Sequence, residues 1–303
     1  MNKQNKKQPL VSVIMNCYNG KSYLRESINS VLAQTYENWE LIFWDNRSDD
    51  QSAEIFKSYK DQRLRYYYAP KHTPLYPARN EVLKKTSGEF VAFLDTDDFW
   101  EKDKLDLQIP LFEDAEVGVV YGNHFIINEI LNTKKIFLKK KNPRGFILDS
   151  LLKNYCTSLV TLIIRKSFLN TYHPPFDNSF HVMGDFDLII KMSTKYKFEC
   201  VNKPIATYRA HGKNESILKK DMQINELKYW LKKMEQYPII FNNKNFYNSH
   251  QSLKNFEIVS LISKKNFKEA RLKIKEMPYS LKKLKYMVAL LLPNNLVKKF
   301  IQS

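Results

Sequence analysis

The chain has 303 residues, of which 43% are apolar and 14% aromatic, and its net charge is +17. This apolar content excludes an intrinsically disordered chain, and the length allows one large α/β domain with a smaller appendage. Residues 219–303 carry 18 basic and 6 acidic side chains, or +12, so the positive charge lies mainly in the C-terminal part.

The N-terminal third alternates short apolar runs with segments of helical periodicity. The expected strands are 11–16, 40–44, 64–68 and 90–94, and the expected helices between them are 23–34, 52–59 and 77–86. Strands that alternate with helices at this spacing predict a mainly parallel sheet. Ligands of such sheets bind beyond the carboxyl ends of the strands, where two of these four strands end in aspartate clusters.

After about residue 100 the pattern changes. The expected elements are strands at 118–121 and 159–164, a helix at 186–192 and an edge strand at 203–208. From residue 221 onward the sequence predicts amphipathic helices, with breaks at Pro278 and Pro293. We therefore expect an α/β domain over residues 1–218 and a basic helical region over residues 219–303.

The cluster Asp95-Thr96-Asp97-Asp98 directly follows the apolar run FVAFL. Three carboxylates so close together repel one another unless a positive charge lies among them. A hard divalent cation supplies that charge when it is bound by one or two carboxylates and by substrate phosphates. Such an ion neutralises a departing phosphate group. The alternative is a solvated acidic turn that caps a helix.

Two further polar residues belong to the same part of the sequence. Asp45 ends the second strand, where its carboxylate could accept a hydrogen bond from the imide N–H of a base such as uracil. The alternative for Asp45 is an Asx turn. Arg79 lies in the helix before the aspartate cluster and could neutralise carboxylates or contact phosphate. A surface salt bridge is the alternative for Arg79.

The second half of the sequence offers a base and a second metal ligand. Asp185 lies at an expected helix start, where a carboxylate beside an acceptor hydroxyl acts as a general base or simply caps the helix. Asp187 is a second candidate base. His211 could complete a metal shell or bind phosphate, and Arg209 could bind phosphate, although a lone histidine is more often inert.

Five segments, in this order, resemble glycosyltransferase family 2, a large inverting family with the GT-A fold. They are VSVIMNCYNG at 11–20, ELIFWDNRSDDQS at 40–52, Ala78-Arg79-Asn80 with GEFVAFLDTDD at 88–98, GDFDL at 184–188 and YRAH at 208–211. The resemblance covers roughly residues 10–216, which is about two thirds of the chain.

The resemblance implies a metal-dependent hexosyl or N-acetylhexosaminyl transferase that uses a nucleotide-sugar, with UDP as the expected nucleotide. The acceptor would be a hydroxyl of a glycan or lipid-linked intermediate in bacterial surface polysaccharide or lipopolysaccharide biosynthesis. Asp185 is implied as the catalytic base, and Asp97 and His211 as ligands of Mn²⁺ or Mg²⁺. The residues implied to bind the nucleotide-sugar are Tyr18, Asp45, Arg79, Asp95 and Arg209.

Two positions depart from the family pattern. The usual Asp-Asp-Gly-Ser is Asp45-Asn46-Arg47-Ser48 here, so Arg47 removes a glycine that reaches φ > 0 and adds a cation beside the base site. The usual Glu-Asp is Gly184-Asp185, which keeps the base and loses its acidic neighbour. We expect these changes to affect the choice of nucleotide and the contacts to the acceptor.

The basic C-terminal region could meet an anionic membrane surface. The apolar segment 287–293 is short and is flanked by Lys282, Lys283, Lys285, Lys298 and Lys299. This pattern favours a helix that lies on an anionic leaflet beside a lipid-linked acceptor, or a helix packed on the catalytic domain. A Lys-rich solvated surface explains the charge equally well.

The compartment follows from what the sequence lacks. The N-terminal MNKQNKKQPL has no apolar signal region, and no apolar run approaches the ~20 residues of a membrane span. Cys17, Cys156 and Cys200 are far apart and read as reduced core residues. We expect a cytoplasmic protein, free or peripheral on the inner face of the cytoplasmic membrane.

Three other functions are weighed against this one. A sugar nucleotidyltransferase would need a glycine-rich phosphate loop after the first strand, and the whole chain has seven glycines. A basic nucleic-acid-binding protein would show a recognition motif, which we do not find, so no nucleic-acid partner is expected. A catalytically inactive relative would bind nucleotide without turnover.

Overall fold

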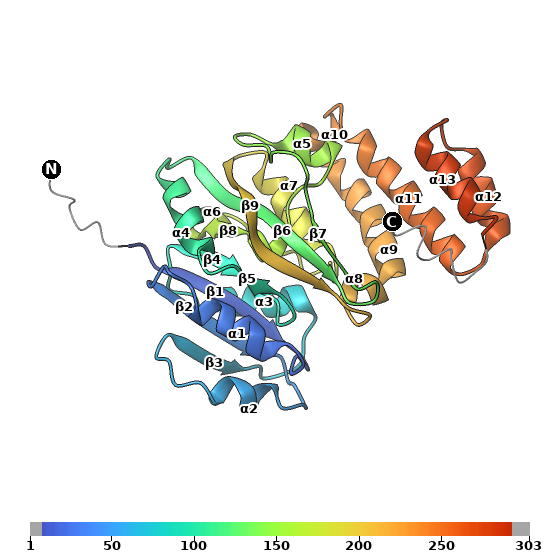
Figure 1. Cartoon of the computed structure of the whole chain (residues 1–303). Coiled ribbons are helices and arrows are strands. Elements are labelled where there is room, and N and C mark those ends of the chain that lie inside the picture. The colour runs from blue at the N-terminus through green and yellow to red at the C-terminus, as the bar shows by residue number, and fades with distance from the viewer. Residues whose placement is uncertain (1–7, 293–303) are drawn as a thin grey trace. The chain divides into compact units, whose positions relative to one another are not determined.

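The computed structural model describes residues 8–292 of the chain (Figure 1). Contacts within the chain divide it into two units, with the boundary between Asn214 and Glu215. The sequence analysis places this boundary after residue 218. Each unit is described by itself below.

The N-terminal half of the first unit is a parallel sheet with helices between its strands. The strands are β1 (Val11–Cys17), β2 (Trp39–Asp45), β3 (Leu64–Tyr68) and β4 (Phe90–Phe93), in the spatial order β3-β2-β1-β4. The helices are α1 (Leu24–Leu32), α2 (Ser52–Lys57) and α3 (Leu75–Leu83). The predicted alternation is confirmed, and the ends of these elements lie within three residues of those expected.

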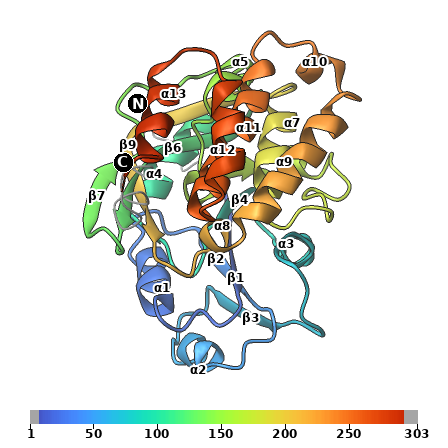
Figure 2. The same ribbon diagram turned by 90° about the vertical axis from the view of Figure 1, so that its right-hand side faces the viewer.

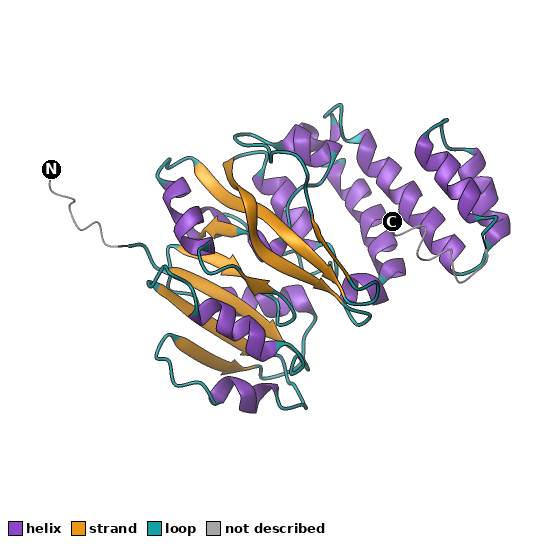
Figure 3. Cartoon of the chain, viewed as in Figure 1, coloured by secondary structure: helices purple, strands orange, loops and turns teal. Residues whose placement is uncertain are grey.

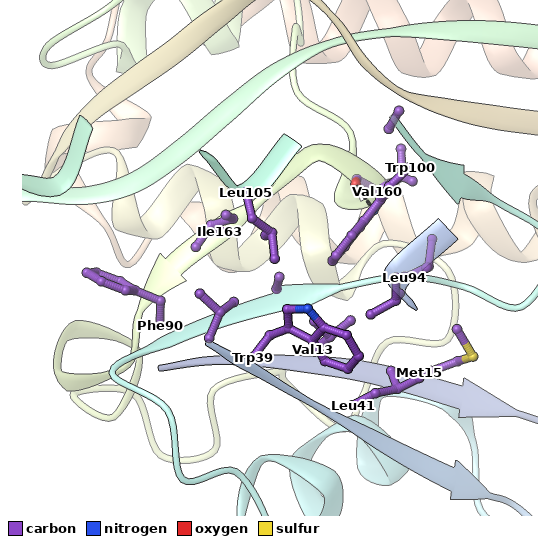
Figure 4. Packing of buried hydrophobic residues seen from close by; sticks show 14 of the residues in the cluster. Val13, Met15, Trp39, Leu41, Phe90, Leu94, Trp100, Leu105, Val160 and Ile163 are labelled. Carbon is purple, nitrogen blue, oxygen red and sulfur yellow. Dashed lines mark hydrogen bonds between the residues drawn. The ribbon is translucent and has the colours of Figure 1, made fainter. Parts of the chain in front are cut away.

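Buried side chains cover both faces of β1, β2 and β4. Alternate residues such as Val13, Met15 and Leu41 point to one face and pack in a core that includes Leu24 and Ile28 of α1 (Figure 4). Figure 2 shows α1 and α3 on opposite sides of β1. Because helices cover both faces, the loops at the carboxyl ends of the strands are the parts left to form a site.

The sheet continues through strands of mixed direction (Figure 3). β8 (Ile163–Arg165) pairs antiparallel with β4 and with β6 (Val117–Asn128), and β9 (Lys197–Ala210) runs parallel to β6. The short strands β5 (Phe99–Trp100) and β7 (Thr133–Ile136) pair antiparallel with β9 and β6. The remaining helical segments of this unit are α4 (Lys104–Gln108), η1 (Ile109–Phe112), α5 (Leu148–Lys153), η2 (Leu159–Thr161), α6 (Lys166–Leu169) and α7 (Gly184–Met192).

The prediction of an edge strand at 203–208 is wrong. This segment belongs to β9, which lies between β6 and β5, and its residues Ile205 and Ala206 are fully buried. Pro204 suggested an edge because proline has no N–H for a ladder hydrogen bond. Here the proline lies at an irregularity in the β6–β9 pairing, where the register shifts between Gly122 and Asn123, and such a break tolerates it.

The three cysteines are free and buried, which confirms the prediction that they are core residues; they are Cys17, Cys156 and Cys200.

The second unit is helical over its described residues, as the sequence predicts. Its helices are α8 (Glu215–Leu218), α9 (Lys220–Met234), α10 (Pro238–Phe241), α11 (Tyr247–Ser263), α12 (Phe267–Lys275) and α13 (Leu281–Ala289). Pro278 separates α12 from α13, as expected, whereas Pro293, Lys298 and Lys299 lie outside the described residues. Between residues 8 and 292, none of the helices combines the length and the apolar character that crossing a bilayer requires.

Candidate active site

Hydrogen bonds join the two loops that follow β1 and β2. The backbone N–H of Asn19 donates to Ser48 Oγ, and that of Gly20 donates to Ser52 Oγ, each over 3.1 Å. Short polar side chains are suited to such local contacts with backbone groups. The two loops therefore form one rim at the carboxyl edge of the sheet.

Tyr18 presents an aromatic ring on this rim. Its side chain is 55% exposed, and its ring centroid lies 4.4 Å from that of His72. His72 is fixed in turn, because its Nδ1 lies 2.9 Å from the carbonyl oxygen of Asn46. An exposed ring held in this way offers a stacking surface for a nucleotide base. The sequence analysis missed His72, which lies in a loop without a motif.

Asp45 lies at the end of β2 with its carboxylate turned into the protein. Its side chain has no exposed surface, and one carboxylate oxygen accepts the N–H of Ser48 over 2.7 Å. The other oxygen accepts the hydroxyl of Tyr66, also over 2.7 Å. The carboxylate thus organises the turn after β2, as in the Asx-turn alternative, and the contact with the base that the resemblance implies stays a prediction.

Arg47 corrects one expectation. The replacement of glycine was expected to remove a φ > 0 conformation, yet Arg47 itself adopts φ = 72°. Its guanidinium lies 5.0 Å from the centre of the Tyr68 ring, a cation–π contact that helps to offset the steric cost of this conformation. The turn therefore keeps the glycine-like backbone and gains a cation at its edge.

Arg79 holds the first aspartate of the cluster. The NH2 group of Arg79 lies 2.7 Å from Asp95 Oδ1, and the Arg79 side chain is almost fully buried, whereas that of Asp95 is 42% exposed. The charged guanidinium holds the partly exposed Asp95 carboxylate in one position by a charge-assisted hydrogen bond. These two residues come together as the sequence analysis expects for a donor-binding pair.

Asp97 and His211, which are expected to bind metal, also come together. His211 Nε2 lies 2.9 Å from Asp97 Oδ2, although 114 residues separate them in the chain. Asn214 Nδ2 donates to the same oxygen over 3.2 Å and to the carbonyl oxygen of Arg209 over 2.9 Å. Burial and the neighbouring charge of Asp95 raise the pKa of Asp97. The sequence analysis missed Asn214, because a single asparagine in a polar loop carries no pattern.

The donor set fits a hard divalent ion that keeps most of its ligands outside the protein. Among the described residues, histidine, cysteine and acidic side chains form no group of three or more that could enclose a metal. One carboxylate with one imidazole therefore leaves the other positions to phosphate oxygens and water. Mg²⁺ is commonly bound in this way, and carboxylate, phosphate and water oxygens also suit Mn²⁺.

Asp98, the last aspartate of the cluster, faces inward. It is 3% exposed, and its Oδ1 accepts the backbone N–H of Arg209 over 2.9 Å. Its backbone carbonyl accepts the hydroxyl of Ser27 over 2.6 Å. Burial and the charges of Asp97 and Asp95 raise its pKa well above the usual carboxyl range. Asp98 thus anchors the turn to β9 and α1.

The guanidinium of Arg209 is neutralised by carboxylates. Its NH1 lies 2.9 Å from Glu129 Oε1, its NH2 pairs with Glu26, and its Nε donates to the backbone carbonyl of Asp97 over 3.1 Å. Arg209 is only 9% exposed. The resemblance implies a contact with the diphosphate, which stays a prediction; in this structure the guanidinium contacts these three protein groups. In this structure Arg209 joins three parts of the fold.

Tyr23 connects this ion pair to His211, a predicted metal ligand. Its hydroxyl donates to Glu129 Oε2 over 2.6 Å, and the Arg209 guanidinium lies 4.5 Å from the centre of its ring. The same ring stacks on that of His211, with centroids 5.1 Å apart. Tyr23, Glu26 and Glu129 carried no signal in the sequence, because their partners lie 80 or more residues away.

Asp185 lies in the first turn of α7, beside α3. Its Oδ1 accepts the hydroxyl of Tyr76 over 2.8 Å. Burial raises the pKa of Asp185, while the charge of Arg79 and the Tyr76 hydroxyl oppose that rise. Asp187, the second candidate base, is 1% exposed and forms a 2.6 Å ion pair with Lys191. Of the two carboxylates, Asp185 is therefore the one placed to accept a proton from a ligand.

The ring of Tyr76 explains why residue 184 is a glycine. A Cβ atom at Gly184 would lie 2.7 Å from Cδ2 of Tyr76, closer than such contacts allow. Tyr76 is 1% exposed, so its ring has no free space into which it could move. The loss of the acidic neighbour that the resemblance suggests is therefore linked to the aromatic residue that hydrogen-bonds the remaining aspartate.

Residues 12–171 match the family model described as Glycosyl transferase family 2, and this stretch is more than half of the chain. The chain belongs to glycosyltransferase family 2. This confirms the resemblance that the sequence motifs suggest, and it assigns the Asp95–Asp98 cluster and the loops after β1 and β2 to the part that the family shares.

Curated relatives of this glycosyltransferase family 2 chain come from bacteria. The UDP-Glc:alpha-D-GlcNAc-diphosphoundecaprenol beta-1,3-glucosyltransferase WfgD of Escherichia coli is 36% identical over 167 residues, which are 55% of this chain and 64% of WfgD. The putative teichuronic acid biosynthesis glycosyltransferase TuaG of Bacillus subtilis is 31% identical over 161 residues, 52% of this chain and 63% of TuaG. The chain thus matches less than two thirds of the length of either relative.

Solved structures share the fold at low sequence identity. Residues 1–349 of Staphylococcus aureus TarS superpose with a TM-score of 0.63 and 18% identity, covering 93% of this chain and 78% of that one. The mannosyltransferase PcManGT of Pyrobaculum calidifontis, in complex with GDP-Man and Mn²⁺, gives a TM-score of 0.66 and 17% identity over 98% of this chain and 84% of its own. The predicted GT-A fold is confirmed.

Proposed function

We propose that this family 2 chain transfers a sugar from a UDP-sugar to a hydroxyl of a lipid-linked bacterial glycan by a metal-dependent inverting displacement. The arrangement that carries the proposal is the set of carboxylates at the carboxyl edge of the sheet. Asp95 is exposed beside Arg79, Asp97 lies beside His211, and Asp185 lies beside Tyr76. Arg79 connects the first and last of these sites, because it binds Asp95 and its charge opposes the rise in the pKa of Asp185 that burial causes.

In this proposal Asp185 removes the proton of the acceptor hydroxyl as the oxygen attacks the anomeric carbon. The new glycosidic bond forms on the face opposite the diphosphate, the bond from the anomeric carbon to the phosphate oxygen breaks, and the nucleoside diphosphate leaves. A divalent ion on Asp97 and His211 would neutralise the charge on that diphosphate. Tyr18 provides the stacking surface for the base, and Arg79 keeps Asp95 in place.

The names of related proteins support UDP as the nucleotide. WfgD is named for a UDP-Glc donor, and TarS has been crystallised with UDP and with UDP-GlcNAc. PcManGT, in contrast, was solved with GDP-Man. Since the turn after β2 carries Arg47 beside the expected base site, GDP and CDP belong in any test of the donor.

The acceptor proposal rests on the same kind of support. WfgD is named for an acceptor sugar on diphosphoundecaprenol, and TuaG for teichuronic acid biosynthesis. A polyprenyl-linked acceptor would be presented at a membrane surface, which is consistent with peripheral association on the inner face of the cytoplasmic membrane.

Thermal unfolding with nucleotides tests the donor site. We expect UDP with Mn²⁺ to raise the melting temperature by about 5 °C at saturating concentration, with smaller shifts for GDP and CDP. Asp97→Ala should lose the part of the shift that depends on Mn²⁺. Asp114→Ala is the matched control, since Asp114 is 48% exposed and pairs with Lys197 at the amino edge of the sheet.

Three results would contradict the proposal. If no nucleotide changed the melting temperature of a folded sample, the proposed donor site would be wrong. If Mn²⁺ changed the melting temperature equally in Asp97→Ala and in wild type, Asp97 would not be a metal ligand. Nucleotide binding without hydrolysis or transfer, tested with radiolabelled UDP-sugars and a membrane extract, would identify the chain as an inactive relative.

A further inference from the structure

One face of α13 exposes a line of apolar side chains. We call Leu281, Leu284 and Met287 of α13, together with Leu291 in the turn after the helix, the α13 stripe, and they are 88%, 56%, 49% and 81% exposed. The spacing of three residues places the first three on one side of the helix. Single exposed apolar residues are common on protein surfaces, whereas an aligned set indicates a surface that meets a partner.

The opposite side of α13 already has its own packing. Tyr286 and Ala289 are buried in the core of the second unit, together with Ile258, Ile262 and Ile274. The helix is therefore fixed by one apolar face, and the stripe is a second apolar face that this core does not use.

Lysines border the stripe on both sides. With about 100° of rotation per residue, the stripe spans about 120°, and Lys283 and Lys285 fall about 40° beyond its two edges. The Nζ of Lys283 is held by the carbonyl oxygens of Lys275 and Met277 and lies 5.7 Å from the ring of Tyr279. Tyr279, just before the helix, is fully exposed.

We propose that the α13 stripe docks on an anionic lipid bilayer. The helix would lie in the plane of the interface, with the stripe residues among the acyl chains and the basic side chains of this unit facing the layer of phosphate groups. Tyr279 suits the same level, because aromatic residues with a polar end favour the membrane interface. The +12 charge of residues 219–303 complements an anionic leaflet. The functional role of this docking rests on the proposed function, in which the lipid-linked acceptor lies at a membrane.

Vesicle sedimentation tests the proposal on the full-length protein. We expect wild type to bind vesicles of phosphatidylglycerol and phosphatidylcholine at least about tenfold more tightly than vesicles of phosphatidylcholine alone, and to lose binding as NaCl is raised. Leu284→Asp with Met287→Asp should weaken binding at least about tenfold. The matched control is Ile239→Asp, since Ile239 is an apolar residue of α10 in the same unit and is 66% exposed.

The outcomes separate the proposal from its rivals. Binding that is unchanged in the double variant, or lost equally in Ile239→Asp, would overturn it. The same holds if wild type forms a dimer in light-scattering measurements that the double variant abolishes, because the stripe would then cover a second copy. No nucleotide is present in this assay, so a failed UDP shift leaves the vesicle result intact, and the reverse also holds.

Discussion

Asp185 shows how neighbouring residues adjust a single carboxylate. Burial makes the group more basic than an exposed aspartate, while Arg79 and the Tyr76 hydroxyl stabilise its ionised form. A base must be deprotonated at the working pH and still basic enough to accept a proton. In the proposed reaction, burial favours acceptance of a proton by Asp185, and Arg79 and the Tyr76 hydroxyl favour its deprotonated form.

The hydroxyl of Tyr76 therefore affects the pH dependence of the reaction. Tyr76→Phe removes a hydrogen bond to the carboxylate that lowers the pKa of Asp185, so this pKa should rise in the variant. The acid limb of log(kcat/KM) against pH should move to higher pH by the same amount. Tyr155→Phe is the control, because Tyr155 lies near Asp185 and has its own pKa raised, in part, by that charge. A limb that does not move, or moves to lower pH, would contradict this assignment.

Sequence patterns identify residues that lie at the ends of regular strands. The Asp97–His211 and Arg79–Asp95 pairs were predictable because each belongs to a recognisable segment at the carboxyl edge. The surrounding partners were not predictable, because Glu129 and Asn214 interact with side chains that only the folded sheet brings close to them. The hydrogen bonds of Asp45 to Ser48 and Tyr66 were also not predicted, because a sequence does not show which donors the fold brings to a carboxylate.

At the level of elements, Arg209 joins α1, the end of β6 and β9. Glu26 comes from α1, and Glu129 directly follows β6. Tyr23 completes the connection, because it bonds Glu129 and stacks on His211. These contacts should hold the imidazole in the orientation that places its Nε2 beside Asp97.

Glu129→Gln tests this positioning role. We expect the apparent KM for Mn²⁺ to rise about tenfold, with kcat at saturating Mn²⁺ close to that of wild type, because residues behind a metal ligand set its affinity. Glu89→Gln is the matched control, since Glu89 pairs with Arg165 over 3.2 Å away from these residues. A fall in kcat with an unchanged KM for Mn²⁺ would instead indicate that the Arg209 network acts directly on the diphosphate.

The elements were predicted with unequal success. Those of the first hundred residues follow the alternation of apolar and helical periods, so their order and type were readable. β9 was assigned to an edge because the irregularity that accommodates Pro204 depends on its pairing with β6. Pairing between strands 80 residues apart leaves no local trace.

At the scale of the whole molecule, one buried lysine affects how stability depends on pH. Lys104 is fully buried, donates to Gln108 Oε1 over 2.7 Å and lies 4.1 Å from the Trp100 ring. Burial lowers its pKa well below the usual lysine value. Between the lowered pKa and about 10.4, the unfolded chain binds more protons than the folded one. Stability therefore rises with pH in that window.

We expect this lysine to contribute up to about 1.4 kcal/mol per pH unit to the slope of the unfolding free energy. Denaturant unfolding of wild type and Lys104→Met at pH 7, 8 and 9 measures the difference. Wild type should gain stability relative to the variant as the pH rises. Lys84→Met, at an exposed position, should show no such trend. A parallel pH dependence in wild type and Lys104→Met would mean that Lys104 is charged in the folded state.

The close packing of Tyr76 against Gly184 has a consequence for the evolution of the family. A side chain at position 184 and an aromatic ring at position 76 exclude each other, because a Cβ atom would lie 2.7 Å from the ring. Homologues that carry an acidic residue at position 184 should therefore have a residue smaller than tyrosine at position 76. Positions 76 and 184 should therefore covary. A change from one pair of residues to the other takes two substitutions, and the intermediate with only one of them should pack poorly.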